Sequence, residues 1–142
     1  MSENIEIIGP VIALVVWSMV MWVWMYATRI PAMIAAEVRL DPNAPSGELV
    51  SKLPANVRWK ADNYNHLMEQ PTIFYALALS LALLGEGSGF NLYVAWAYVL
   101  LRIIHSLVHV LGNNIKLRFF VFVFSNIPIL ILLYNSIVTI SN

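Results

Sequence analysis

The sequence contains no cysteine, and charged residues are scarce along its 142 positions. Without cysteine the chain forms no disulfide, no thiolate metal site and no cysteine nucleophile, so any thiol chemistry requires a thiol from another molecule. Charged residues make up 11% of the chain, against about 25% in an ordinary soluble domain, and 60% of the residues are hydrophobic. We therefore do not expect a soluble monomer.

An excess of charge of one sign is also missing. Eight Lys and Arg residues balance eight Asp and Glu residues. Because binding to a phosphate backbone needs a basic excess, nucleic acid is excluded as a natural partner. We find no internal repeat and no low-complexity tract, and we predict one domain over residues 1–142.

Long apolar runs predict four membrane-crossing helices. The uncharged run 7–28 alone is long enough to cross a hydrocarbon core of about 30 Å. Glu3 and Glu6 stand where a signal peptide carries positive charge, so we expect this first helix to be retained. The predicted spans cover about 7–35, 58–84, 91–112 and 116–140, with a polar, Pro-containing cytoplasmic loop at 37–57.

The distribution of positive charge predicts the orientation. Basic residues flank the long loop and the third connection, namely Arg39, Lys52, Arg58, Lys60, Lys116 and Arg118. The N-terminus and the turn at Glu86 carry none, so both termini should lie on the non-cytoplasmic side. The predicted fold is an all-α, antiparallel, integral membrane four-helix bundle.

Two charges lie inside predicted spans. A charged side chain near the bilayer centre costs about 2.5 to 3.5 kcal/mol on insertion scales, so Glu69 and Arg102 need a reason to be there. Helix rise places them at similar depths, about 13 and 15 Å from the cytoplasmic boundary. A structural ion pair between Glu69 and Arg102 is the favoured interpretation, and a functional role is the alternative.

Polar residues form a stripe on each of these two helices. Arg102, His105 and His109 share one face of the third span, with Ser106 beside them. On the second span the predicted stripe consists of Asp62, Asn65, Glu69 and Thr72, with His66 next to it. We expect the two stripes to face each other, and polar contact between helices is the simplest role for Ser106 and Thr72.

The histidine spacing raises the question of a metal. His105 and His109 are four residues apart, and Glu69 or His66 would be a third ligand. Arg102 repels a divalent cation and no HExxH motif is present, so we predict no metal site. A proton relay through Glu69, Arg102 and His105 is a more distant alternative, because the polar cluster is confined to the cytoplasmic half.

Arg118 lies at the cytoplasmic start of the fourth predicted span, close to the depth of His109. Its guanidinium stays charged at any relevant pH, and a nearby cation favours the thiolate form of a bound thiol. Arg118 is thus the candidate catalytic residue. The alternative is that Arg118 and Lys116 only anchor the helix at the cytoplasmic surface.

Two segments carry a resemblance to a known family. They are residues 65–74, NHLMEQPTIF, and residues 102–109, RIIHSLVH. Together with the four spans, they resemble the MAPEG family, the membrane-associated proteins in eicosanoid and glutathione metabolism, and most closely its bacterial members. The resemblance implies a homotrimer in a bacterial inner membrane, with glutathione between protomers near the cytoplasmic side and a lipophilic substrate arriving from the bilayer.

The resemblance also assigns roles by position. Glu69 resembles the carboxylate that contacts the glutathione amine, and Arg118 the arginine that activates the thiol. Arg102, His105 and His109 resemble positions of the prostaglandin E synthase branch of the family, and Asn65 and His66 complete the implied glutathione-binding set. Three residues depart from the pattern of glutathione-using members: Asp62 replaces an arginine, His66 an asparagine and Phe119 a serine.

These observations predict a glutathione-dependent membrane transferase or peroxidase that acts on a lipophilic electrophile. The expected partners are membrane lipids, a lipophilic small molecule and two further copies of the chain. The alternative is a non-catalytic trimeric membrane protein that binds a lipid or another lipophilic ligand. Acidic Asp62 favours the alternative, because it repels a glutathione carboxylate.

Overall fold

A computed structural model of the chain describes residues 5–141, and every regular element within that range is an α-helix. The six helices are α1 (Ile8–Ala35), α2 (Glu48–Ser51), α3 (Ala55–Glu69), α4 (Pro71–Leu83), α5 (Gly89–Leu111) and α6 (Ile115–Ser141). The prediction of an all-α fold is therefore confirmed.

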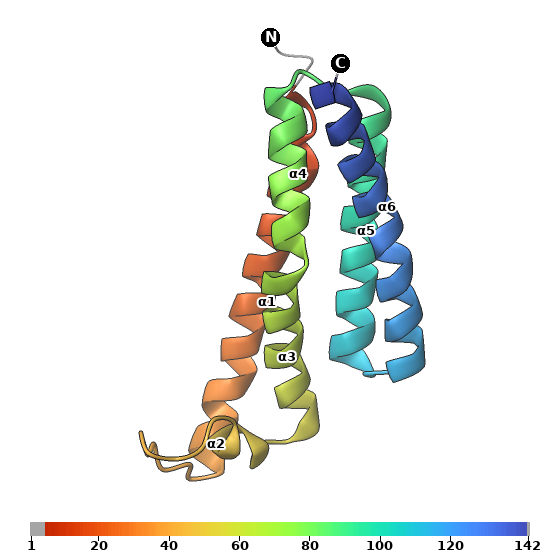
Figure 1. Cartoon of the computed structure of the whole chain (residues 1–142). Helices are drawn as coiled ribbons and strands as arrows, with labels where there is room; N and C mark the ends of the chain where they lie inside the picture. Colours follow the sequence, from red (N-terminus) through yellow and green to blue (C-terminus); the bar gives the residue numbers. More distant parts are fainter. Residues whose placement is uncertain (1–4, 142) are drawn as a thin grey trace.

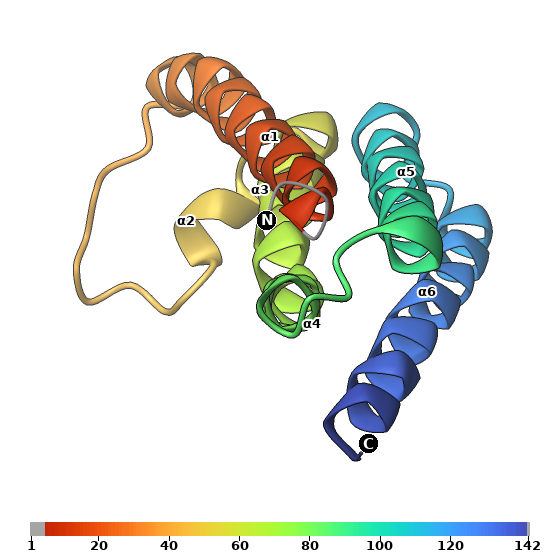
Figure 2. The same cartoon turned by 90° about the horizontal axis from the view of Figure 1, so that it is seen from above.

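The long helices lie side by side along one common direction (Figure 1). Helices α3 and α4 stack end to end and run beside α1, while α5 and α6 form a second antiparallel pair (Figure 1). The loop around α2 and the α5–α6 turn lie at one end of the molecule, and the α4–α5 turn lies at the other (Figure 1). Seen from above, the segment between α1 and α3 swings outward, away from α5 and α6 (Figure 2).

Three of the described helices are long and apolar enough to cross a membrane, namely α1, α5 and α6. Helices of this length and composition are typical of an integral membrane protein. Helices α3 and α4, of 15 and 13 residues, are each shorter than these three.

The predicted second span is divided where the sequence analysis expected one helix. Helix α3 ends at Glu69 and α4 begins at Pro71. Proline has no N–H to donate to the carbonyl four residues earlier, and its ring crowds that carbonyl. The hydroxyl of Thr72 instead donates to the Glu69 carbonyl at 2.7 Å, and this bond stabilises the junction.

The loop predicted at 37–57 is also partly helical. It contains the short helix α2, which the sequence analysis did not anticipate, and α3 already begins at Ala55. Gly47 precedes α2 with a φ of 85°, a left-handed conformation that glycine adopts without a steric penalty.

The centre of the bundle is closely packed. Fully buried side chains come from all the long helices and include Leu14, Met21, Phe74, Tyr98 and Leu132. The rings of Phe74 and Tyr98 stack with centroids 4.5 Å apart, which joins α4 to α5. In a membrane such close packing, rather than exclusion of water, holds helices together.

We predict that Phe74→Ala lowers the free energy of unfolding by about 3 to 5 kcal/mol, because it leaves a cavity against Tyr98. Ile73→Ala is the matched control, since Ile73 lies on the same helix and is 53% exposed. Thermal unfolding in detergent measures both variants. Equal melting temperatures for the two would contradict this packing.

Candidate functional site

All the side chains of the polar stripe predicted on α5 are buried. Arg102 and Ser106 are 0% exposed, His105 is 1% exposed and His109 is 4% exposed. Their spacing places them on one helical face, and that face turns toward α3 and α6. The expectation of an inward polar face on α5 is confirmed.

The predicted ion pair between Glu69 and Arg102 is wrong. The side chain of Glu69 is 67% exposed, and its Oε2 lies 2.8 Å from Nδ1 of His66 on the same helix. Arg102 instead donates from Nη2 to the His66 carbonyl at 3.1 Å and from Nη1 to Oε1 of Gln70 at 3.4 Å. The break before Pro71 leaves Gln70, rather than Glu69, on the inward side.

Gln70 is the centre of a hydrogen-bond network that joins three helices. Its Oε1 accepts from Arg102 and lies 3.5 Å from the hydroxyl of Tyr98, both on α5. Its Nε2 donates to Oδ1 of Asn126 on α6 at 2.5 Å. A buried guanidinium is costly unless acceptors surround it, and Gln70 brings one of these acceptors to Arg102.

The polar stripe predicted on the second span is not buried against α5. Its four members, Asp62, Asn65, Glu69 and Thr72, are all exposed. On the side of α3 that meets α5, the polar residues are Asn63 and His66, and Nδ2 of Asn63 donates to Oγ of Ser106 at 2.6 Å. Helical periodicity groups residues on one face correctly. Two faces of α3 carry polar residues, however, and the predicted stripe lies on the more exposed face.

Three histidines meet beside this network. The ring of His66 lies 5.2 Å from that of His105 and 6.5 Å from that of His109, measured between centroids. Within residues 5–141, both ring nitrogens of His105 and Nδ1 of His109 are buried without a hydrogen-bond partner. No group of three potential metal ligands is close enough to hold an ion in this part of the chain.

Two neighbouring hollows open next to the histidines. One, of about 190 Å³, is lined by His66, His105, Ile115, Arg118, Phe119 and Phe122. The other, of about 270 Å³, is lined by Asp62, His66, Glu69, His109 and Arg118. Because the two hollows share His66 and Arg118, we treat them together and call them the polar cleft.

Arg118 is held in place at the polar cleft by the turn between α5 and α6. Its Nη1 donates to Oδ1 of Asn113 at 2.6 Å. Asn113 has a φ of 45°, a left-handed conformation that asparagine tolerates better than most residues. The guanidinium is therefore positioned by a tight turn, with no carboxylate within 4 Å among residues 5–141, and its charge is available to a ligand.

The structure thus brings together most of the predicted site residues. Arg118, Glu69, His66, His105 and His109 all line the polar cleft. Arg102 lies deeper, in the Gln70 network, and Asn65 is exposed and lines neither hollow.

The sequence analysis missed three residues that shape this region: Gln70, Asn113 and Phe122. Phe122 stacks on the His66 ring with centroids 5.3 Å apart. The signal for Gln70 was present in the sequence, because Ser125 and Asn126 are isolated polar residues in an apolar span and require partners.

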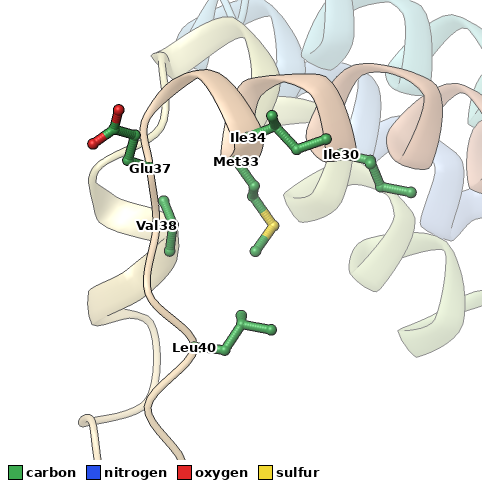
Figure 3. A pocket seen from close by; sticks show the side chains of 6 residues that line it. All are labelled: Ile30, Met33, Ile34, Glu37, Val38 and Leu40. Carbon is green, nitrogen blue, oxygen red and sulfur yellow. The ribbon is translucent and has the colours of Figure 1, made fainter.

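A separate hollow of about 310 Å³ lies where α1 ends. Apolar side chains line most of it, and the full lining is Ile30, Met33, Ile34, Glu37, Val38 and Leu40. Figure 3 shows Met33, Val38 and Leu40 around the space, with the Glu37 carboxylate turned away from it. This hollow shares no residue with the polar cleft.

The fold and the site define an all-helical integral membrane protein with a polar cleft built from buried histidines and a fixed arginine. The model of the MAPEG family matches residues 7–138, nearly the whole chain, and the protein belongs to that family. Searches of curated proteins and of solved structures gave no significant match.

We predict that Gln70→Leu lowers the free energy of unfolding by about 2 to 3 kcal/mol, because it removes a hydrogen-bond acceptor from a buried charge. Gln70→Glu is the matched variant: it keeps the acceptor oxygens and adds a charge opposite to that of Arg102. Gln70→Glu also loses the hydrogen bond from Nε2 to Asn126, so we expect it to unfold between Gln70→Leu and wild type in detergent. Wild-type stability of Gln70→Leu would show that Arg102 does not depend on Gln70.

Proposed function

We propose that this protein is a thiol-dependent membrane transferase or peroxidase, with glutathione as the first thiol to test and a lipophilic electrophile as the second substrate. One observation carries the proposal. The fixed guanidinium of Arg118 lines the same cleft as His105 and His109, whose buried ring nitrogens have no partner within the described chain. Membership of the MAPEG family agrees with it.

The chemistry that this arrangement favours is stabilisation of a thiolate. A free thiol has a pKa of about 8.5 and is mostly protonated at neutral pH, and a neighbouring cation shifts it toward the nucleophilic thiolate. Arg118 supplies that cation, and the imidazoles supply hydrogen-bond donors that orient the ligand. Glu69 and His66 border the same space and contact the rest of the thiol molecule.

The thiolate then reacts with a substrate from the bilayer. Its sulfur forms a bond to an electrophilic carbon, and the displaced electron pair leaves with a leaving group or takes up a proton. With a lipid hydroperoxide, the sulfur instead attacks the terminal oxygen, the O–O bond breaks and the lipid leaves as an alcohol after protonation. The thiol is oxidised to a sulfenic acid, which a second thiol molecule converts to a disulfide with release of water. Neither route needs a covalent bond to the protein, so placement and thiolate stabilisation account for catalysis.

Four membrane crossings complete the proposal. Helices α3 and α4 stacked end to end reach about 43 Å at 1.5 Å per residue, which is enough for one crossing alongside α1, α5 and α6. The basic residues of the α2 loop and of the α5–α6 turn lie at the same end of the molecule (Figure 1). By the positive-inside rule, that end lies in the cytoplasm and both termini lie outside. The resemblance to bacterial members of the family implies that the membrane is bacterial.

We propose that the protein assembles as a homotrimer, as the resemblance to the MAPEG family implies. In the isolated chain, the Glu69 carboxylate is 67% exposed at a level where lipid tails would surround it. A charge facing hydrocarbon is costly, so we propose that a neighbouring copy of the chain covers this face and closes the polar cleft. The thiol would then bind between protomers, with lipids on the outer surface.

The alternative, a non-catalytic protein that binds a lipophilic ligand, draws support from a different region. Apolar hollows lie along α1, one at its end (Figure 3) and one of about 410 Å³ over Val15, Val16, Met19, Val20 and Val23. A lipid chain fits such surfaces without any polar contact.

We predict that glutathione produces a saturable thiolate absorbance with the purified protein, and that Arg118→Ala reduces it by roughly tenfold or more, which corresponds to one pKa unit. Ultraviolet difference titration in detergent measures the signal. Arg118→Lys keeps the positive charge and should retain part of it.

Lys116→Ala is the matched control, because Lys116 is exposed and outside the polar cleft. An equal loss in Lys116→Ala would mean that only the general positive charge of this surface matters. A complete absence of thiolate with wild type at saturating glutathione and with smaller thiols would favour the non-catalytic alternative.

A further inference from the structure

The charges around the polar cleft are unevenly distributed. Of the residues that line its larger hollow, Asp62 and Glu69 are acidic and both are exposed on α3. Arg118 is the cation, and it lies on α6, on another side of the hollow. A ligand in this space therefore meets negative charge on α3 and positive charge on α6.

Of the two acidic residues, Asp62 lacks the ion-pair partner that Glu69 has in the described part of the chain. Within the described residues it forms no ion pair within 4 Å, either with Arg58 one turn earlier or with Arg118 across the hollow. Glu69 has one partner, His66, whose charge depends on protonation. The α3 side of the cleft consequently holds net negative charge that a ligand can use.

The buried histidines are a second, independent feature of this space that favours a polar ligand. His109 lines the same hollow, is 4% exposed and leaves Nδ1 without a partner among the described residues. His105, 1% exposed, lines the adjoining hollow with both ring nitrogens unpaired. Buried polar nitrogens without partners are costly, and a polar ligand in the cleft would satisfy them.

We infer that the polar cleft selects a small aminothiol, one that carries an ammonium group at the end opposite its sulfur and no carboxylate there. The ammonium lies against Asp62 and Glu69, and the sulfur points to Arg118 and the histidines. This inference rests on the proposed function and names the thiol class that serves it. Glutathione, with two carboxylates, is then a poorer ligand than its role in the family suggests.

Coulomb's law gives the direction of the selectivity. An ammonium group near Asp62 is attracted, and a carboxylate in the same place is repelled, by an energy that is modest where water enters the cleft. We expect about a fivefold to tenfold preference for the ammonium-bearing thiol.

Three thiols of similar size isolate this effect: 2-aminoethanethiol, uncharged 2-mercaptoethanol and anionic 3-mercaptopropionate. Each is titrated into the detergent-purified full chain, alongside glutathione, with thiolate absorbance as the readout. Because the free thiols differ in acidity, each affinity is compared between wild type and a variant, so that the intrinsic difference cancels. The variants are Asp62→Asn, Asp62→Arg and the control Glu86→Gln, which removes an acid at the opposite end of the molecule (Figure 1).

The inference predicts that Asp62→Asn weakens binding of 2-aminoethanethiol several-fold relative to wild type and leaves that of 2-mercaptoethanol unchanged, and that Asp62→Arg weakens binding of 2-aminoethanethiol further while it strengthens that of 3-mercaptopropionate and glutathione. Glu86→Gln should leave every affinity unchanged. Affinities of 2-aminoethanethiol and 3-mercaptopropionate that do not change with the charge at Asp62, or that change in the opposite direction, would overturn the inference while the proposed function stands. Failure of all four thiols to form an Arg118-dependent thiolate would overturn both.

Discussion

The burial of one permanent charge, the guanidinium of Arg102, constrains the rest of the structure. It is 0% exposed in the centre of the bundle, where acceptors are scarce, and no carboxylate within 4 Å neutralises it in the described chain. Its solvation comes from the His66 carbonyl and from Gln70 at the break between α3 and α4. Gln70 in turn requires the amide of Asn126 on α6, so a single charge fixes the relative positions of α3, α5 and α6.

The polar cleft follows from that arrangement. With α5 held by Arg102, its next two turns place His105 and His109 between α3 and α6, where each residue lines a hollow and has buried ring nitrogens without a protein partner in the described chain. The short α5–α6 turn brings Arg118 to the same space, and Asn113 fixes it there. One end of the bundle thus combines a cation, buried imidazoles and two carboxylates beside apolar helix faces. Such a site suits a polar thiol and a lipophilic partner at once, as we propose for this member of the MAPEG family.

Much of this fold can be predicted from the sequence, because long uncharged runs admit few alternatives to membrane helices, and the buried face of α5 follows from the spacing of Arg102, His105 and His109. The α3 side was harder to predict. Asp62 and Glu69 share one helix face, whereas Asn63 and Gln70 share another, and only packing decides which face turns inward. Pro71 indicates a kink in the second span. That Gln70, rather than Glu69, becomes a partner of Arg102 depends on tertiary contacts with α6. The turn that positions Arg118 depends on backbone geometry at Asn113, which periodicity does not report.

The most direct test is a cryo-electron microscopy map of the protein in lipid nanodiscs with 2-aminoethanethiol or glutathione at saturating concentration. The account predicts a homotrimer in which the neighbouring protomer covers Glu69, with sulfur density in the polar cleft within hydrogen-bond reach of the Arg118 guanidinium. A cleft that stays empty or holds a lipid chain at saturating thiol, with Arg118 turned away, would contradict it.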